Sequence, residues 1–292
     1  MSDFLFERWS FSKCMDAAKC LRKFFLRRVA RVRADAAPWL LGGRAVHAGQ
    51  EADNRAKIAG ESLPVVAVHE AAVEALKKYS ADEGVKTDVD RFAIEHGRQL
   101  EVFEESGERA KIRPVPGSVE AAFEMDLMVG DSESGLKSAV LEGFVDVVSA
   151  DETDQRTLVD YKTAGRPTSQ NEAKAHVQLA LEAEGAKAHD SKIVTFVKHA
   201  KQKPTAKVTE PVANTKENFE RAIKFVADQI HAARRAMVTG DFPKCDPAAV
   251  HCQWGKQCEY GAICFTTNDL KDFVEVKEIR PVGTVPTPEW RK

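Results

Sequence analysis

Residues 142–165 read EGFVDVVSADETDQRTLVDYKTAG, and this stretch decides the fold of the chain. Two mainly apolar segments flank the polar turn ADETDQ, which predicts two consecutive strands. Each predicted strand carries an aspartate, Asp146 or Asp160, where a buried strand normally carries a hydrophobic residue. Alternation across a strand predicts two sets of side chains that share a face: Phe144, Asp146 and Val148, and Leu158, Asp160 and Lys162.

If the two strands pair, the carboxylates of Asp146 and Asp160 and the ammonium of Lys162 converge at one end of a sheet. Two buried carboxylates without a partner cost several kcal/mol, and a divalent cation between them removes that cost. Carboxylate oxygens with positions left for water suit Mg²⁺ or Mn²⁺. The simpler interpretation is a salt bridge between Asp160 and Lys162 on a solvated strand face, with Asp146 incidental.

The pattern along the rest of the chain predicts an α/β fold. Helices are expected over 10–33, 44–59, 65–80, 86–104, 172–184 and 216–238, and strands over 119–128, 139–149, 157–163, 192–198 and 206–212. The glycine pair Gly42-Gly43 is expected to lead into the second helix and to place His47 early on it, where it could be a third ligand. A lone histidine is more often structural. No apolar run reaches the roughly 18–20 residues of a membrane span.

Charge is distributed unevenly along a chain of 292 residues and net charge −2. Six basic residues and no acidic one lie between positions 22 and 33: Arg22, Lys23, Arg27, Arg28, Arg31 and Arg33. Such a run can bind phosphates locally. It is also typical of organelle transit peptides, although Asp3, Glu7 and Asp16 interrupt the pattern. Without a secretory segment we expect a cytoplasmic protein, in which six cysteines indicate metal binding more than disulfides.

Several motifs in order resemble the RecB-type branch of the PD-(D/E)XK nuclease superfamily. They are Gly43-x-x-x-His47, Gly143-Phe144-Val145-Asp146, Val159-Asp160-Tyr161-Lys162-Thr163 and Gln178-Leu179, preceded by SFSKCMDAAKCLRKFFL over 10–26. The resemblance covers residues 10–265 and implies a restriction-endonuclease-like core sheet flanked by helices. It implies a single nuclease domain over 1–267, with an N-terminal helical part (10–60), a catalytic core (115–215) and a cysteine segment (243–265), followed by a tail (268–292).

The resemblance also implies a role for each matching residue. His47, Asp146 and Asp160 would bind the metal ion with the main-chain carbonyl of Tyr161, and Lys162 would be the catalytic lysine. Gln178 would orient this lysine or contact DNA, and Glu120, in SVEAAF, would support the site as a strand glutamate. Two departures stand out. Asp160 occupies a position that is often Glu, and Glu182 stands where a DNA-contacting tyrosine commonly follows the glutamine.

Four cysteines lie within the segment CDPAAVHCQWGKQCEYGAIC, residues 245–264. The C-x-x-C pairs of zinc knuckles are missing from it. The segment resembles the iron–sulfur members of this branch, which implies that Cys252, Cys258, Cys264 and the distant Cys20 bind a [4Fe–4S] cluster. Cys245 competes with Cys20 as the fourth ligand. Such a link would join the N- and C-terminal segments and remove about 5 kcal/mol of unfolded-state entropy. A zinc site from the C-terminal cysteines, or free cysteines, are the alternatives.

Together these features predict a metal-dependent deoxyribonuclease, an exonuclease on single-stranded or end-opened DNA in phage-like recombination, replication or repair. The N-terminal basic run, with Phe24 and Trp254 stacking on bases, would guide the strand. The simpler role is core packing for Phe24 and packing beside the cluster for Trp254. No G-x-x-x-x-G-K-[ST] motif occurs, so a separate helicase or recombinase would be the partner. The alternatives are a CRISPR-adaptation-type nuclease and a non-catalytic DNA-binding iron–sulfur or zinc protein.

Overall fold

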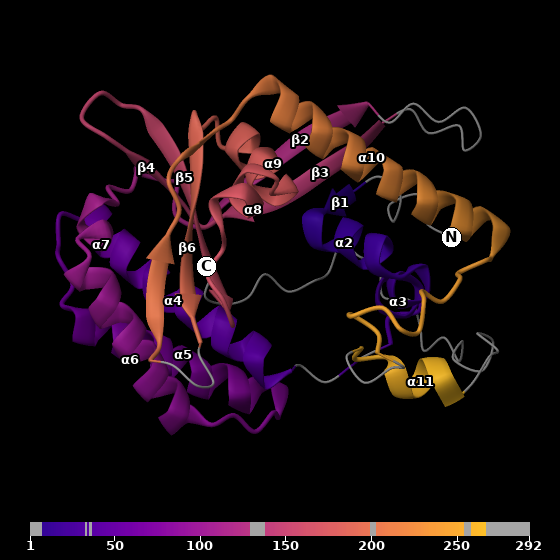
Figure 1. The fold of residues 1–292 in the computed structure, drawn as a ribbon, viewed down its shortest axis with the longest axis horizontal. Coiled ribbons are helices and arrows are strands. Elements are labelled where there is room, and N and C mark those ends of the chain that lie inside the picture. The colour runs from indigo at the N-terminus through magenta and orange to yellow at the C-terminus, as the bar shows by residue number, and fades with distance from the viewer. Residues whose placement is uncertain are drawn as a thin grey trace. The chain divides into compact units, whose positions relative to one another are not determined.

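The computed structural model describes residues 8–32, 34, 37–128, 138–198, 203–253 and 258–266 (Figure 1). The expected tail over 268–292 and Trp254 lie outside this part of the chain. The chain forms two compact units. Residues 1–34, 126–141 and 226–292 make the terminal unit, and residues 35–125 and 142–225 make the sheet unit.

The sheet unit contains a five-stranded sheet in the order β4-β5-β6-β7, with β8 also paired to β6. Its strands are β4 (Val147–Ala150), β5 (Arg156–Ala164), β6 (Asp190–Val197), β7 (Thr205–Val208) and β8 (Val212–Ala213). β4 and β5 are antiparallel, as the turn at 150–155 predicts, whereas β5 and β6 are parallel. A parallel pair needs a crossover connection, which helices α8 (Gln170–Lys174) and α9 (Val177–Gly185) provide.

Helices cover both faces of this sheet. One face packs against α4 (Pro38–Ile58), α5 (Val65–Glu83) and α6 (Val89–Glu105), and the short helix α7 (Glu108–Lys111) follows α6 (Figure 1). The other face packs against α8 and α9. Along β5, Val159 and Tyr161 belong to the first core and Leu158 to the second. Asp160 and Lys162 therefore point toward α9, as alternation predicts.

The expected strand over 139–149 is broken at Asp146. β3 (Ser138–Val145) belongs to a three-stranded sheet of order β1-β3-β2, and β4 belongs to the five-stranded sheet. The bend interrupts the alternation, so Val145 and Val148 pack into the same core and Phe144 is 44% exposed. The expectation that Phe144, Asp146 and Val148 share a face is therefore wrong.

The glycine pair lies inside α4 rather than before it. A Cβ on Gly42 would lie 3.2 Å from Nζ of Lys198, and one on Gly43 would lie 3.2 Å from Oγ1 of Thr163. The two glycines thus allow this helix to approach the sheet closely. The expected helix over 172–184 is likewise interrupted: α8 ends at Lys174, and His176 is the N-cap of α9.

The terminal unit begins with β1 (Arg8–Ser10), α2 (Phe11–Lys19), α3 (Leu21–Phe24) and the π-helical turn η1 (Phe25–Val29). The single helix expected over 10–33 is broken at Cys20, which has an extended backbone (φ −168°, ψ 117°). Phe24 is buried and stacks on Trp9, so it is a core residue as the simpler interpretation holds. The other elements that lie wholly or partly in this unit are β2 (Ala121–Met128), β3, α10 (Lys216–Thr239) and α11 (Gly261–Thr266).

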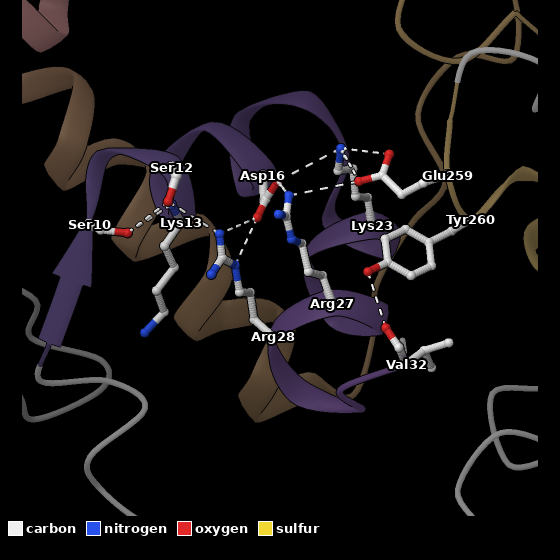
Figure 2. A network of polar contacts seen from close by, with 10 residues as sticks. All are labelled: Ser10, Ser12, Lys13, Asp16, Lys23, Arg27, Arg28, Val32, Glu259 and Tyr260. Carbon is white, nitrogen blue, oxygen red and sulfur yellow. Dashed lines mark hydrogen bonds and ion pairs between the residues drawn. The ribbon is translucent and has the colours of Figure 1, made fainter. Parts of the chain in front are cut away.

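The basic run makes contacts within the terminal unit, many of them to the buried carboxylate of Asp16 (Figure 2). Arg28 lies 2.7 Å and Arg27 3.2 Å from the Asp16 oxygens. Lys23 lies 2.8 Å from Glu259. Further contacts join the two ends of the chain: Arg22 to the carbonyl of Phe242 and the hydroxyl of Tyr260 to the carbonyl of Val32. Four of the six basic residues therefore serve the packing of this unit.

Within the described part of the chain, none of the helices has the length and apolar character that a membrane crossing requires.

Candidate active site

Asp146 stands at the point where the main-chain pairing of β4 with β5 ends. The last paired residues are Val147 and Val159. Beyond them, the Asp146 carboxylate takes over: its Oδ2 accepts a 2.7 Å hydrogen bond from the main-chain N–H of Tyr161. Its Oδ1 lies 3.0 Å from Nδ1 of His47 on α4. The break between two sheets thus turns one carboxylate toward both a strand edge and a histidine.

Glu120 joins this pair more closely than the sequence predicts. One ligand atom each of His47, Glu120 and Asp146 lies within 4.8 Å of the other two. Glu120 precedes β2 rather than lying within a strand, and its backbone is in the left-handed region (φ 50°). A non-glycine residue pays for this conformation and needs surrounding contacts to hold it. Here the N–H of Glu120 donates to the carbonyl of Asp146 at 3.0 Å.

Asp160 and Lys162 lie on the face of β5 that is turned to α9. Nζ of Lys162 donates to Oδ1 of Asp160 at 2.8 Å. Asp160 is 3% exposed, and its Oδ2 accepts no hydrogen bond from the described residues. The Lys162 side chain is 30% exposed. The salt bridge considered from the sequence exists, but it is partly buried and leaves a carboxylate oxygen without a partner.

Gln178 and Glu182 extend this contact along α9. Oε1 of Gln178 accepts a 3.2 Å hydrogen bond from Nζ of Lys162, and its Nε2 donates to Oε1 of Glu182 at 2.7 Å. Glu182 is 7% exposed. It was noted from the sequence only as a departure from a family pattern. Its spacing of four residues from Gln178 was the available signal, because side chains at that spacing meet on one helix face.

Burial and the neighbouring charges raise the pKa of four groups in this site. Burial, then the nearby Asp160 carboxylate, raises the pKa of Glu182 well above its usual value. Burial likewise raises the pKa of Asp160, although Lys162 acts against it. Burial disfavours the charged form of Lys162, but the carboxylates of Asp160, Glu182 and Asp146 together outweigh it and raise the Lys162 pKa to about 12. For His47, burial is outweighed by Asp146, which raises the pKa to about 9.

These residues fit a divalent cation. Acidic side chains exceed basic ones, and the inward oxygen of Asp160 has no hydrogen-bond donor among the described residues. One histidine nitrogen and several carboxylate oxygens form a donor set suited to Mn²⁺, and the oxygens suit Mg²⁺. The N–H and C=O of one strand residue point to the same side, so the carbonyl of Tyr161 also faces Asp146.

The cysteines gather elsewhere, in the terminal unit. Five line one pocket: Cys20, Cys245, Cys252, Cys258 and Cys264. Burial, then the adjacent Cys20, raises the pKa of Cys245 to about 12, and Cys245 also contacts Cys252. Cys14 is fully buried and is not among the residues that line this pocket. The structure therefore brings together every cysteine considered as a cluster ligand from the sequence.

A model of the PD-(D/E)XK nuclease superfamily matches residues 8–265. The chain belongs to the PD-(D/E)XK nuclease superfamily. Members of this superfamily are nucleases that hydrolyse phosphodiester bonds with divalent metal ions. The match extends over the candidate site residues and over the cysteine pocket.

Two solved structures are similar to this chain. A crystal structure of a protein named "putative exonuclease" from Eubacterium rectale is 14% identical with a TM-score of 0.50, over 87% of this chain and 90% of that one. The protein SSO0001 is 11% identical with a TM-score of 0.31, over 73% of this chain and 82% of that one. Comparison with curated proteins found no match.

Proposed function

We propose that the chain is a metal-dependent DNA exonuclease that acts on single-stranded or end-opened DNA. The observation that carries this proposal is the convergence of His47, Glu120 and Asp146 at the strand that bears Asp160 and Lys162. One buried oxygen of Asp160 is unpartnered among the described residues. A salt bridge alone would not require the second aspartate, the histidine and the left-handed backbone of Glu120 at the same place.

Each residue has a distinct part in this proposal. His47, Asp146 and Asp160 bind the cation, with Glu120 and the Tyr161 carbonyl as further ligands. A bound Mg²⁺ or Mn²⁺ lowers the pKa of a water molecule and polarises the scissile phosphate. Lys162 donates a hydrogen bond to the phosphate oxygen on which negative charge develops. Asp160 and Gln178 hold its ammonium group, because each accepts a hydrogen bond from Nζ.

Support for an exonuclease comes from the name of the Eubacterium rectale protein, whose fold this chain shares. Support for an open DNA end comes from the sequence, which has no ATP-binding motif with which to unwind a duplex. A separate helicase or recombinase would supply the single strand. The proposal includes a role in recombination, replication or repair of the phage type, which rests on the sequence resemblance.

The test uses end-labelled single-stranded DNA with Mn²⁺, Mg²⁺ or EDTA. Substrates with free ends, a blocked 5′ end, a blocked 3′ end or a closed circle separate the exonuclease from an endonuclease and give its polarity. We expect the linear strand to be degraded with Mn²⁺, the circle to survive, and Asp160→Ala to be inactive. Asp82→Ala, an exposed aspartate of α5, is the matched control. Equal survival of DNA with the wild type and with Asp160→Ala would overturn the proposal.

We also propose that the cysteine pocket binds a [4Fe–4S] cluster. Among the described residues, no three cysteine sulfurs lie within 4.8 Å of one another. A tetrahedral zinc ion with Zn–S bonds of about 2.3 Å would bring its sulfurs to about 3.8 Å. Cys245 contacts Cys20 and Cys252, but the sulfurs of the pocket are not gathered around one point, which favours a larger group of the kind that cysteine thiolates bind.

Iron and acid-labile sulfide analysis of anaerobically purified protein tests this proposal. Cys258→Ser should lose the iron, and Cys14→Ser, outside the pocket, should retain it. Comparison of Cys20→Ser with Cys245→Ser identifies the fourth ligand, for which Cys20 is our choice. Stoichiometric zinc without iron would overturn the cluster.

A further inference from the structure

Glu182 is a buried acidic residue that neither the metal ligands nor the catalytic lysine accounts for. It lies one turn after Gln178 on α9 and is 7% exposed. Its Oε1 accepts the 2.7 Å hydrogen bond from Nε2 of Gln178, whose Oε1 in turn accepts from Nζ of Lys162 at 3.2 Å. The three side chains therefore form a line of hydrogen bonds from Glu182 on α9 through Gln178 to Lys162 on β5.

The orientation of the Gln178 carboxamide decides whether this chain works. An amide has an accepting oxygen at one end and a donating NH₂ at the other. Only the oxygen can bind an ammonium group, because NH₂ facing Nζ would place donor against donor. The acceptor of Glu182 binds the NH₂ end and so leaves the oxygen for Lys162. Without Glu182 the amide can rotate by half a turn.

We propose that Glu182 is a positioning residue that fixes the Gln178 carboxamide and, through it, the ammonium of Lys162. This inference rests on the proposed function of Lys162 and adds a residue to it. Packing alone does not explain an acid here, since an apolar side chain of similar volume would fill the space without the cost of burying a carboxyl group.

Three variants separate positioning from packing. Glu182→Leu keeps the volume and removes the acceptor, Glu182→Gln keeps an acceptor oxygen, and Glu184→Leu makes the same change at an exposed position of α9. A hydrogen bond to a charged group predicts a fall in kcat of about tenfold or more for Glu182→Leu with KM unchanged. Glu182→Gln and Glu184→Leu should keep kcat within about threefold. Gln178→Leu should match Glu182→Leu, and the double variant should lose no more.

A second readout does not depend on cleavage of DNA. Labelling of amines followed by mass spectrometry measures how firmly Lys162 is held. We expect Lys162 to react about tenfold faster in Glu182→Leu than in the wild type, and at the wild-type rate in Glu182→Gln. Calorimetry should show unchanged uptake of Mn²⁺ by Glu182→Leu, since Glu182 is not a ligand.

The outcomes are distinguishable. An unchanged labelling rate of Lys162 in Glu182→Leu would overturn the positioning role, whatever the activity. Loss of Mn²⁺ uptake in that variant would make Glu182 a ligand and would also overturn it. If the wild type leaves DNA intact while Lys162 is labelled faster in Glu182→Leu than in the wild type, the nuclease proposal fails and the positioning of Lys162 by Glu182 stands.

Discussion

The main-chain N–H of Tyr161 donates a 2.7 Å hydrogen bond to the side chain of Asp146, where a neighbouring strand would normally offer a carbonyl. One carboxylate therefore completes the edge of β5 with Oδ2 and faces His47 with Oδ1. Structure and chemistry depend on different oxygen atoms of the same side chain. Substitutions at this position can separate the two.

Asp146→Asn should separate them. Its amide oxygen can still accept from Tyr161, so we expect a free energy of unfolding within about 0.5 kcal/mol of the wild type. Uptake of Mn²⁺ should be lost, because the amide brings no negative charge to the site. Asp146→Ala should lose uptake and about 1–3 kcal/mol of stability, since the N–H of Tyr161 loses its acceptor. Urea unfolding measures the stability, and calorimetry measures the uptake of Mn²⁺. Equal stability of Asp146→Asn and Asp146→Ala would contradict the structural role of the hydrogen bond from Tyr161.

The ring of Phe123 leaves no room for a side chain at two glycines of the sheet unit. A Cβ on Gly143 would lie 2.7 Å from its ring, and one on Gly185 would lie closer still. Gly185→Ala should destabilise the protein by about 1–3 kcal/mol through overpacking. Phe123→Leu together with Gly185→Ala should recover part of this loss, because the smaller side chain makes room. Additive losses in this double-mutant cycle would show that the clash is relieved elsewhere.

The buried carboxylate of Asp16 stabilises the terminal unit through the ion pairs of Figure 2. Asp16→Asn keeps the shape and removes the charge that Arg27 and Arg28 contact. We expect Asp16→Asn to lower the free energy of unfolding, measured with urea, by about 2 kcal/mol. High salt should reduce this difference less than it would for an exposed ion pair, because a buried pair is screened less. Asp82→Asn, on the exposed surface of α5, is the control and should be within about 0.5 kcal/mol of the wild type.

His96 makes the sheet unit sensitive to acid. Its ring is 1% exposed and lies between Phe92 and Phe196, with His69 and Lys198 as its basic neighbours. Burial, followed by the charge of His69, lowers its pKa from 6.5 to about 3. Below pH 6.5 the unfolded chain therefore takes up a proton that the folded chain does not.

The stability from His96 is complete above about pH 6.5 and falls as the pH drops toward 3, by about 2 kcal/mol at pH 5. His96→Phe cannot take up this proton. Its free energy of unfolding should fall less than that of the wild type between pH 7 and pH 5. Parallel pH profiles of the two proteins would contradict the assignment.

The sequence predicted the core of the candidate site because its signal is local. Asp160 and Lys162 lie two residues apart on one strand, and that spacing alone puts them on one face. The pairing of β4 with β5 follows from the short turn between them. These contacts need no knowledge of the rest of the molecule, which is why alternation and turn chemistry found them.

Other features depend on contacts that a local pattern does not contain. The break at Asp146 arises because β3 and β4 join different sheets, and a strand pattern reads the same through a change of sheet. The glycine pair lies inside α4, close to Lys198 and Thr163, which are far along the chain. The break at Cys20 interrupts an otherwise unbroken helical pattern. Glu182 departs from the family motif, and its contact with Gln178 gives it a place in the site that the motif does not predict.

Asp146 is the single residue between two strands of different sheets, which constrains how this protein can be re-engineered. Inserting or deleting one residue there would move every following side chain of β4 to the opposite face of the sheet. Val147 and Val148, which pack on opposite faces, would then each point to the wrong core. Substitutions of Asp146 leave the register of β4 unchanged, whereas insertions and deletions beside it do not. Loop grafts and tag insertions belong instead in the polar turn at 151–155, where all five residues are exposed and the strands on either side keep their register.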